Sequence, residues 1–404
     1  MRILHVPHAY PPVRGGAELL CQRVSESLSA RGHRVRVVTA DVGDVAGYYQ
    51  FGVRRVPAGR AIVQGVEVLR VPYGGWLYSL GSRGFAQPAL HPALAGPLWR
   101  LIRGRFRLAI QRKIAAHRPD VVMTLPHLVI NVQCVLHAQR LLGFPLVVAP
   151  LIHDDWPESV VRQMGAALSQ AAAVVAATDG EAARLATEFG VPPERIFTAG
   201  MGVDLPPAVP TAPRPPHVLF LGRKVRGKGI PDLLAAMHRV WHKRPDTTLV
   251  LAGSRTPATA EIDRLLAALP AAEQARIRSL DNVTEGEKTR LLRTACCLVL
   301  PSRAESFGLV LLEAMAHATP VVALDLPVFR SVVTLGVDGL LAAPDAPDSL
   351  AGAILCLLND PATANTMGER ARQTVAHRFT WEQVAARYEA AYIWALAGRA
   401  GKGS

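Results

Sequence analysis

Short apolar segments of strand length alternate with segments of helical pattern along the first half of the chain. The strand-like segments are residues 2–7, 33–39, 66–71, 120–125, 146–152 and 173–177. Such an alternation is typical of βαβ units, in which helices connect neighbouring parallel strands. It therefore predicts an α/β fold built on a parallel sheet.

The same alternation begins again at residue 217. Strand-like segments occupy 218–222, 248–253, 297–301 and 320–324, and helical patterns follow at 232–243 and 309–317. Before this second series stands LPPAVPTAPRPP (205–216), whose six prolines exclude a helix and favour an extended connector. We therefore predict two α/β domains, 1–205 and 217–380, joined by a linker at 206–216.

The end of the chain has the pattern of one amphipathic helix over residues 381–397. Val384, Tyr388, Ala391 and Tyr392 would lie on a single face of this helix. We expect that face to pack back on the N-terminal domain.

Composition narrows the class of protein. Half of the 404 residues are hydrophobic and 19% are charged, which excludes a disordered chain. The five cysteines form an odd number without a C-x-x-C pair, which suits neither a zinc site nor a disulfide framework. Apolar stretches such as 141–152 fall short of the roughly 20 residues that cross a bilayer. We therefore expect a cytoplasmic protein with no bound metal.

The net charge of +13 is concentrated in one region. Residues 45–119 carry twelve Lys and Arg against a single acid, Glu67. The stretch 98–114 repeats an apolar residue at every fourth position among arginines, as in an amphipathic helix. An ordinary core helix with a basic face explains this pattern, and so does a binding protein for nucleic acid or an anionic surface without catalysis. No nucleic-acid module is recognisable. We therefore assign the region to an enzyme, as a peripheral docking face on the inner side of a membrane.

Ligands of open parallel sheets bind beyond the carboxyl ends of the strands, and two loops at such positions are rich in glycine. Gly15 and Gly16 precede a helix, where the backbone can approach a phosphate, although an ordinary turn has the same pattern. GRKVRGKG (222–229) begins like a P-loop, but Gly229 replaces the hydroxyl residue that would bind Mg²⁺. The loop contains four cations: Arg223, Lys224, Arg226 and Lys228. They could bind a diphosphate, or they could form an ordinary solvated run of charges.

A third loop lies within PSRAESFGLVLLEAMA (301–316). Glu305 follows a strand, and Gly308 opens a helix whose first amides are available to a ligand. If 305–313 were fully helical, its rise would be about 12 Å, which is comparable to the distance from the sugar to the ribose of a nucleotide sugar. Glu305 and Glu313 would then bind hydroxyls at both ends. Two unrelated helix carboxylates are the alternative.

The fourth position is His153-Asp154-Asp155, directly after an apolar run. A histidine there can bind a substrate hydroxyl or act as an acid or base. The two neighbouring acids diverge and have no further ligand cluster, so they do not predict a metal site. An ordinary surface loop is the alternative.

Together these motifs resemble the retaining nucleotide-sugar glycosyltransferases of family 4, also called glycosyl transferases group 1. The resemblance covers nearly the whole chain and includes Gly202-Val203-Asp204 before the linker. Its most specific element is the E-x7-E spacing from Glu305 to Glu313. It implies the GT-B fold, in which two Rossmann-like domains have parallel sheets facing a central cleft. Ala318 and residues 324–330 depart from the usual pattern of the family.

The resemblance also implies an activity and a set of roles. The activity is transfer of a hexose, with retention, from a UDP- or GDP-linked donor to a glycan, lipid-linked or small-molecule acceptor. The donor is a substrate, and no further cofactor or metal is implied. Arg223 and Lys228 would hold the donor diphosphate and Glu313 the ribose. The transferred sugar would contact Glu305 and the backbone of Phe307, Gly308 and Leu309. From the first domain, the glycine loop at Gly15 and Gly16 and the side chain of His153 would complete the phosphate and sugar contacts.

Overall fold

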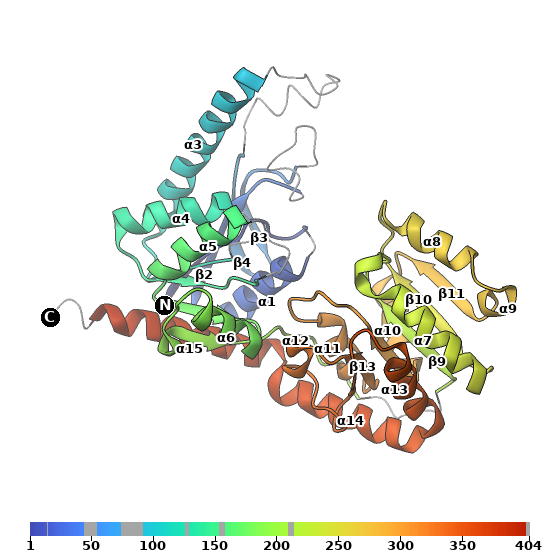
Figure 1. The fold of residues 1–404 in the computed structure, drawn as a ribbon. Coiled ribbons are helices and arrows are strands. Elements are labelled where there is room, and N and C mark those ends of the chain that lie inside the picture. The colour runs from blue at the N-terminus through green and yellow to red at the C-terminus, as the bar shows by residue number, and fades with distance from the viewer. Residues whose placement is uncertain are drawn as a thin grey trace. The chain divides into compact units, whose positions relative to one another are not determined.

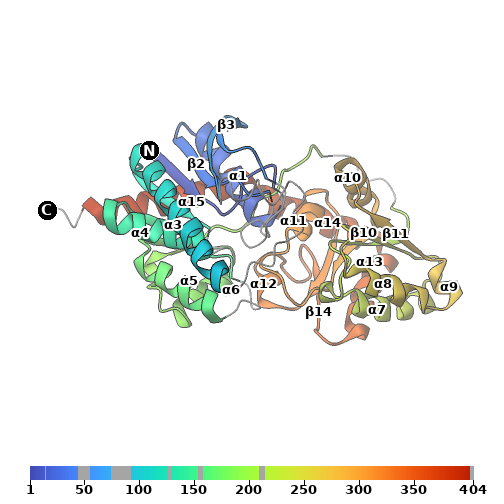
Figure 2. The same ribbon diagram turned by 90° about the horizontal axis from the view of Figure 1, so that it is seen from above.

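The structure is a computed structural model that describes residues 1–13, 15–43, 55–73, 92–125, 129–152, 158–208 and 214–400 (Figures 1 and 2). The chain forms two compact units. Unit 1 comprises Met1–Ala177, Glu181–Ala199 and Val384–Ser404, and unit 2 comprises Thr178–Gly180 and Gly200–Gln383.

Unit 1 is built on an eight-stranded sheet with the order β3-β4-β2-β1-β5-β6-β7-β8. Every pair of neighbouring strands is parallel except β3 and β4, which are antiparallel. The strands are β1 (Arg2–Val6), β2 (Arg34–Ala40), β3 (Gly59–Val63), β4 (Val66–Val71), β5 (Val121–Thr124), β6 (Leu146–Val148), β7 (Ala173–Ala176) and β8 (Ile196–Thr198). The helices are α1 (Gly16–Ala30), α3 (Pro92–His117), α4 (Val129–Leu142), α5 (Glu158–Gln170), α6 (Asp179–Thr187) and most of α15 (Trp381–Ala400).

Unit 2 contains a six-stranded, all-parallel sheet with the order β11-β10-β9-β12-β13-β14. The strands are β9 (His217–Leu221), β10 (Thr248–Gly253), β11 (Ile277–Asp281), β12 (Cys297–Leu300), β13 (Val321–Leu324) and β14 (Leu340–Ala342). The helices are α7 (Ile230–Lys243), α8 (Thr259–Ala267), α9 (Ala271–Gln274), α10 (Glu285–Thr294), α11 (Leu309–Ala316), α12 (Pro327–Arg330), α13 (Pro347–Asn359) and α14 (Pro361–Arg378).

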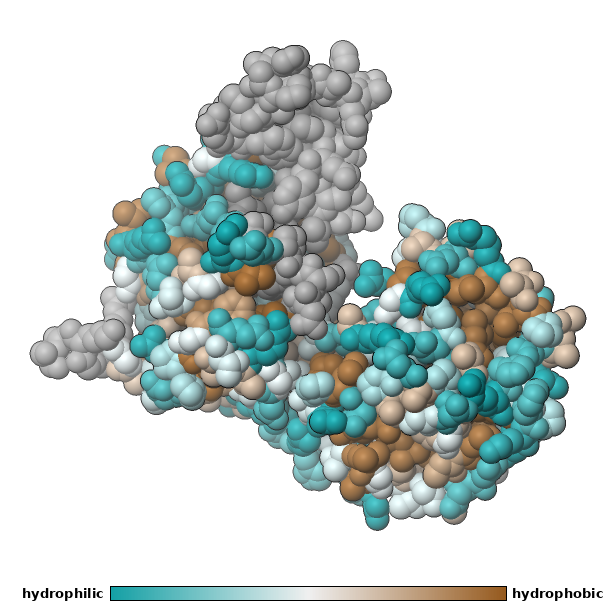
Figure 3. Space-filling view, viewed as in Figure 1, coloured by the Kyte–Doolittle hydropathy of each residue, from teal (hydrophilic) through white to brown (hydrophobic). Residues whose placement is uncertain are grey.

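Both sheets could be predicted from the sequence because their central strands are apolar. Strands β1, β5, β9 and β12 consist almost entirely of buried residues, because helices cover both faces of a parallel sheet. On the described face of unit 2 that Figure 3 draws, hydrophobic residues form separate groups among hydrophilic ones. The predicted α/β class with two parallel sheets is confirmed.

The boundary between the units differs from the position of the proline-rich segment. Gly202 lies against the ring of Trp381, and the Val203 amide donates to the Phe379 carbonyl at 2.9 Å. Arg372 donates to the Pro206 carbonyl at 2.6 Å. These contacts place residues 200–208 with unit 2, so the units divide at Gly200, before the proline-rich segment begins.

The C-terminal helix α15 is fixed to the sheet of unit 1 by a buried polar chain. All four residues of its predicted apolar face are at most 2% exposed. The hydroxyl of Tyr392 lies 2.9 Å from His5 Nε2, and His5 Nδ1 lies 2.7 Å from Ser25 Oγ. Because Ser25 donates its proton to the Cys21 carbonyl, His5 Nδ1 donates to Ser25 and Nε2 accepts from Tyr392. The neutral imidazole therefore satisfies both neighbours.

Burial lowers the pKa of His5 to about 3, from 6.5 in an unfolded chain. Between these values the unfolded state binds a proton that the folded state does not, so stability falls as the pH falls below 6.5. From this group alone the loss at pH 5 is about 2 kcal/mol. We expect the free energy of unfolding to fall between pH 7.5 and pH 5 by about 2 kcal/mol more in the wild type than in His5→Gln. Parallel pH profiles of the two proteins, measured by urea unfolding, would contradict this.

Two helical glycines provide a matched test of the packing in unit 2. A Cβ on Gly368 in α14 would lie 2.0 Å from the Ala318 carbonyl oxygen, whereas a Cβ on Gly352 in α13 meets nothing within 4 Å. We expect Gly368→Ala to destabilise by about 2 kcal/mol or more, because backbone must move. Gly352→Ala should stabilise by up to about 1 kcal/mol through helix propensity. Equal thermal unfolding midpoints for the two variants would show that the helices are not packed as described.

Candidate functional site

The carboxyl ends of β9 and β12 mark the point where the connections of the unit 2 sheet change direction. From β9 the chain crosses to β10 on one side, and from β12 it crosses to β13 on the other. Ligands of doubly wound sheets bind at such a switch point. The two loops that leave it are residues 222–229 and 301–308, which contain half of the site residues predicted from the sequence: Arg223, Lys228, Glu305, Phe307 and Gly308.

These two loops touch through their backbones at Gly229. This residue has a left-handed conformation with a φ of 75°, and a Cβ there would lie 1.9 Å from the Pro301 carbonyl oxygen. Only glycine permits that approach. The contact is accompanied by an ion pair between Lys228 Nζ and Glu305 Oε1 at 2.5 Å, with side chains 17% and 16% exposed. The structure thus brings together two predicted residues that are 77 positions apart.

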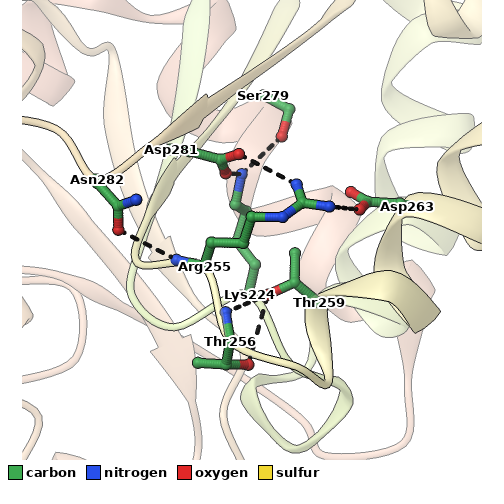
Figure 4. A network of polar contacts seen from close by, with 8 residues as sticks. All are labelled: Lys224, Arg255, Thr256, Thr259, Asp263, Ser279, Asp281 and Asn282. Atoms are coloured by element: carbon green, nitrogen blue, oxygen red, sulfur yellow. Dashed lines mark hydrogen bonds and ion pairs between the residues drawn. The ribbon is translucent and has the colours of Figure 1, made fainter.

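The four cations of the first loop have different surroundings. Arg223 is exposed and has no ion pair among the described residues. Lys224 is buried, donates to Ser279 at 2.8 Å and pairs with Asp281 (Figure 4). Arg226 pairs with an exposed glutamate on α8, Glu261, at 3.2 Å. The expectation of a four-cation clamp is therefore wrong for Lys224, because its side chain is only 1% exposed and its ammonium group is paired inside the protein.

The partners of Lys224 belong to a wider network at the ends of β10 and β11. Arg255 connects Asp281 at 3.1 Å with Asp263 at 2.5 Å, so the two cations share Asp281 (Figure 4). The hydrogen bond from Lys224 is the main cause that lowers the pKa of Asp281. The network joins the loops after β9, β10 and β11 and fixes the backbone from which Arg223 and Lys228 project.

The segment from Glu305 to Glu313 is not fully helical. Helix α11 begins at Leu309, and Gly308 before it is left-handed with a φ of 88°. The predicted helix start at Gly308 is confirmed, and the left-handed turn there separates the loop with Glu305 from the helix with Glu313, so the rise of about 12 Å for a full helix does not apply. Phe307 is buried, with its ring 6.0 Å from that of Phe379. The first amides of α11 have no acceptor within the helix and are oriented by this anchored turn.

Glu313 projects from α11 towards α10. Its Oε1 lies 2.9 Å from Lys288 Nζ, and Lys288 also pairs with Glu285 at 2.8 Å. Burial alone would lower the pKa of Lys288, but the two carboxylates outweigh it and raise that pKa. Glu313 is therefore held next to a permanent cation. The sequence did not indicate Lys288, because the only local signal is its spacing of three from Glu285.

In unit 1 the glycine loop is organised by a buried pair that the sequence analysis missed. Gly15 precedes the first residue of α1, Gly16. Glu18 in the first turn places Oε1 2.7 Å from His8 Nε2, and both side chains are buried. A Cβ on Gly15 would lie 2.2 Å from Glu18 Oε2, so a side chain there would require the carboxylate to shift from its present position. The sequence does contain a signal for this pair, because His8 and Glu18 stand on either side of the glycine turn.

His153, together with Asp154 and Asp155, lies outside the described residues. The chain directly before it is held by Glu181, a buried carboxylate that accepts from the amides of Ile152 at 2.7 Å and Ala177 at 2.6 Å. Burial raises the pKa of Glu181, and the two amide bonds act in the opposite direction. Glu181 was not indicated by the sequence, because its partners are backbone groups.

The two departures from the family pattern adopt defined structures. Ala318, where glycine is usual, has a φ of 56°. In the segment 324–330, Arg330 donates to Asp325 at 2.6 and 2.8 Å, and this bond lowers the pKa of Asp325. Within the described part of the chain, no group of three or more His, Cys, Asp or Glu side chains could hold a metal ion.

Comparison with known proteins agrees with this geometry. Residues 14–206 match the family described as Glycosyltransferase Family 4, and residues 205–374 match Glycosyl transferases group 1. The chain is 28% identical to "Glycogen synthase" of Mycobacterium tuberculosis over 98% of this chain and 96% of that protein.

Two solved structures show the same fold. "Sucrose-phosphate synthase" from Thermosynechococcus elongatus aligns with a TM-score of 0.76 and 22% identity, over 98% of this chain and 100% of that one. Anabaena HepE "in complex with UDP and glucose" aligns with a TM-score of 0.71 and 18% identity, over 96% and 98%.

The fold and the family matches define a glycosyltransferase with two Rossmann-like domains. The chain belongs to family 4 of these enzymes and has the GT-B fold. This assignment favours an enzyme over the non-catalytic binding protein that the basic region also allowed.

Proposed function

We propose that the protein transfers a hexose, with retention and without a metal ion, from a nucleotide-diphosphate sugar to a glycan, lipid-linked or small-molecule acceptor in the cytoplasm. The observation that carries the proposal is the Lys228–Glu305 pair at the switch point of unit 2. It supports the proposal because it holds a cation suited to a diphosphate next to a carboxylate suited to the hydroxyls of a sugar.

Each end of the donor has a suited partner in unit 2. Arg223 and Lys228 supply cations for the diphosphate, with Arg223 exposed and not engaged in an ion pair with any described residue. Glu305 and the backbone at Phe307, Gly308 and Leu309 supply acceptors and donors for sugar hydroxyls. Glu313, held beside Lys288, is suited to accept hydrogen bonds from a ribose. The roles predicted for Gly15, Gly16 and His153 of unit 1 belong to the same proposal.

The chemistry follows from these charges. When the bond between the anomeric carbon and the diphosphate oxygen breaks, its electron pair remains on the diphosphate. Fixed cations and the amides of α11 stabilise that charge without rearranging, as in other preorganised sites. The acceptor hydroxyl would attack on the face that the diphosphate leaves, and a phosphate oxygen would take its proton, which gives retention. UDP-linked sugars are the first donors to test, because HepE was solved with UDP and glucose.

A screen of nucleotide sugars tests the proposal as a whole. UDP- and GDP-linked hexoses are incubated with the protein without an acceptor, and release of the nucleoside diphosphate is measured. We expect slow hydrolysis of a single donor class. If none of the donors is hydrolysed and none binds, the proposed activity is wrong.

With the donor found in this way, the two paired residues can be tested directly. We expect Lys228→Ala and Glu305→Ala each to lower transfer by at least about 100-fold, because each removes a group facing charge or sugar in the transition state. Arg226→Ala, in the same loop, should retain activity within about threefold, because Arg226 pairs with an exposed residue on α8. Near-normal turnover in both site variants, or an equal loss in the control, would refute the assignment.

A further inference from the structure

Helix α3 has a buried apolar stripe and an exposed face that is strongly basic. The stripe consists of Ile102, Phe106, Ile110 and Ile114, each at most 3% exposed. The helix packs beside α4 in unit 1 (Figures 1 and 2). Six exposed cations lie along the helix and directly after its end, and we call them the α3 cations: Arg103, Arg105, Arg107, Arg112, Lys113 and Arg118.

Many other arginines of unit 1 have an acidic partner, which the α3 cations lack among the described residues. None of the six has an ion pair with a residue that the structure describes, whereas Arg2, Arg31 and Arg36 are all paired. The sequence explains this, because no Asp or Glu occurs from residue 68 to residue 119. His117 adds no charge, since burial lowers its pKa. The face is therefore a concentration of positive charge that the protein itself does not neutralise.

An apolar side chain stands in the middle of this charge. Leu108 is 48% exposed and lies one turn from Arg105 on one side and from Arg112 on the other. Arg105, Leu108 and Arg112 lie on the side of the helix opposite the buried stripe, so Leu108 does not pack into the core. A phosphate-rich polymer would attract the arginines but gain nothing from Leu108, whereas a lipid interface binds both kinds of group.

We infer that the α3 cations and Leu108 form a docking surface for anionic phospholipid at the surface of a bilayer. Cations near such a surface each contribute to the attraction, and the contribution decreases within a Debye length. The apolar part is small, and none of the helices, as far as they are described, is long and apolar enough to cross a membrane. The docking is therefore peripheral and sensitive to salt. It does not depend on the identity of the donor or on the proposed transfer.

Vesicle co-sedimentation tests the inference with the full-length protein. We expect binding to vesicles of phosphatidylcholine with phosphatidylglycerol at low salt, little binding to phosphatidylcholine alone, and release as salt is raised. The variant with Arg105, Arg107, Arg112 and Lys113 all changed to Gln should bind the anionic vesicles at least about tenfold more weakly. Its donor hydrolysis should be unchanged, which separates this test from that of the proposed function.

The matched control removes four exposed cations from unit 2 instead: Lys243, Arg264, Arg278 and Arg370, each changed to Gln. It has the same net charge as the α3 variant, and we expect it to retain most of the binding. Equal loss in the two variants would show a general charge effect and overturn the assignment to α3. The assignment would also be overturned if the wild-type protein bound neutral and anionic vesicles equally, or did not bind anionic vesicles. Tighter binding of the protein to duplex DNA than to anionic vesicles would overturn it as well.

Discussion

The close approach of Gly229 to the carbonyl of Pro301 is the constraint on which the site in unit 2 depends. It brings the loops after β9 and β12 into backbone contact, and this contact is possible only without a side chain. Because those strands are neighbours in the sheet, the contact sits at the switch point, where Lys228 meets Glu305. A second glycine, Gly308, turns the chain from that loop into α11. Rigid backbone rather than side-chain flexibility thus positions the charges.

The surrounding ion pairs divide the basic loop into structural and available cations. Lys224 is held among Ser279 and Asp281, and Arg226 lies on the outside against α8. Lys228 is paired with the carboxylate proposed to bind the sugar, and Arg223 has no ion pair among the described residues. The contact between Lys228 and Glu305 orients both side chains before a ligand arrives. The structure therefore distinguishes residues that have the same charge and nearly the same place in the sequence.

The sequence predicted the central strands and missed the strands at the sheet edges. Strands β3 and β8 are the edges of one sheet, and β11 and β14 are the edges of the other. Central strands are buried on both faces and read as apolar runs, whereas these four have mixed exposure or only three residues. Pairs such as His8–Glu18 and Glu313–Lys288 were also missed, because their partners come from different elements. The glycines and charged residues of the loops could be predicted because each is visible in a short stretch of sequence. Which of the loop cations is available to a ligand depends on packing, which the sequence does not show.

In the proposed function, Arg223 and Lys228 hold the donor diphosphate in place of a metal ion. Calorimetric titration of UDP and GDP into the protein with EDTA present tests it most directly, using wild type, Arg223→Gln, Lys228→Gln and Arg226→Gln. We expect one nucleotide to bind in EDTA, the first two variants to bind it at least about tenfold more weakly, and Arg226→Gln to bind it as wild type does. Binding that appears only with Mg²⁺ or Mn²⁺, or that all three variants weaken equally, would contradict it.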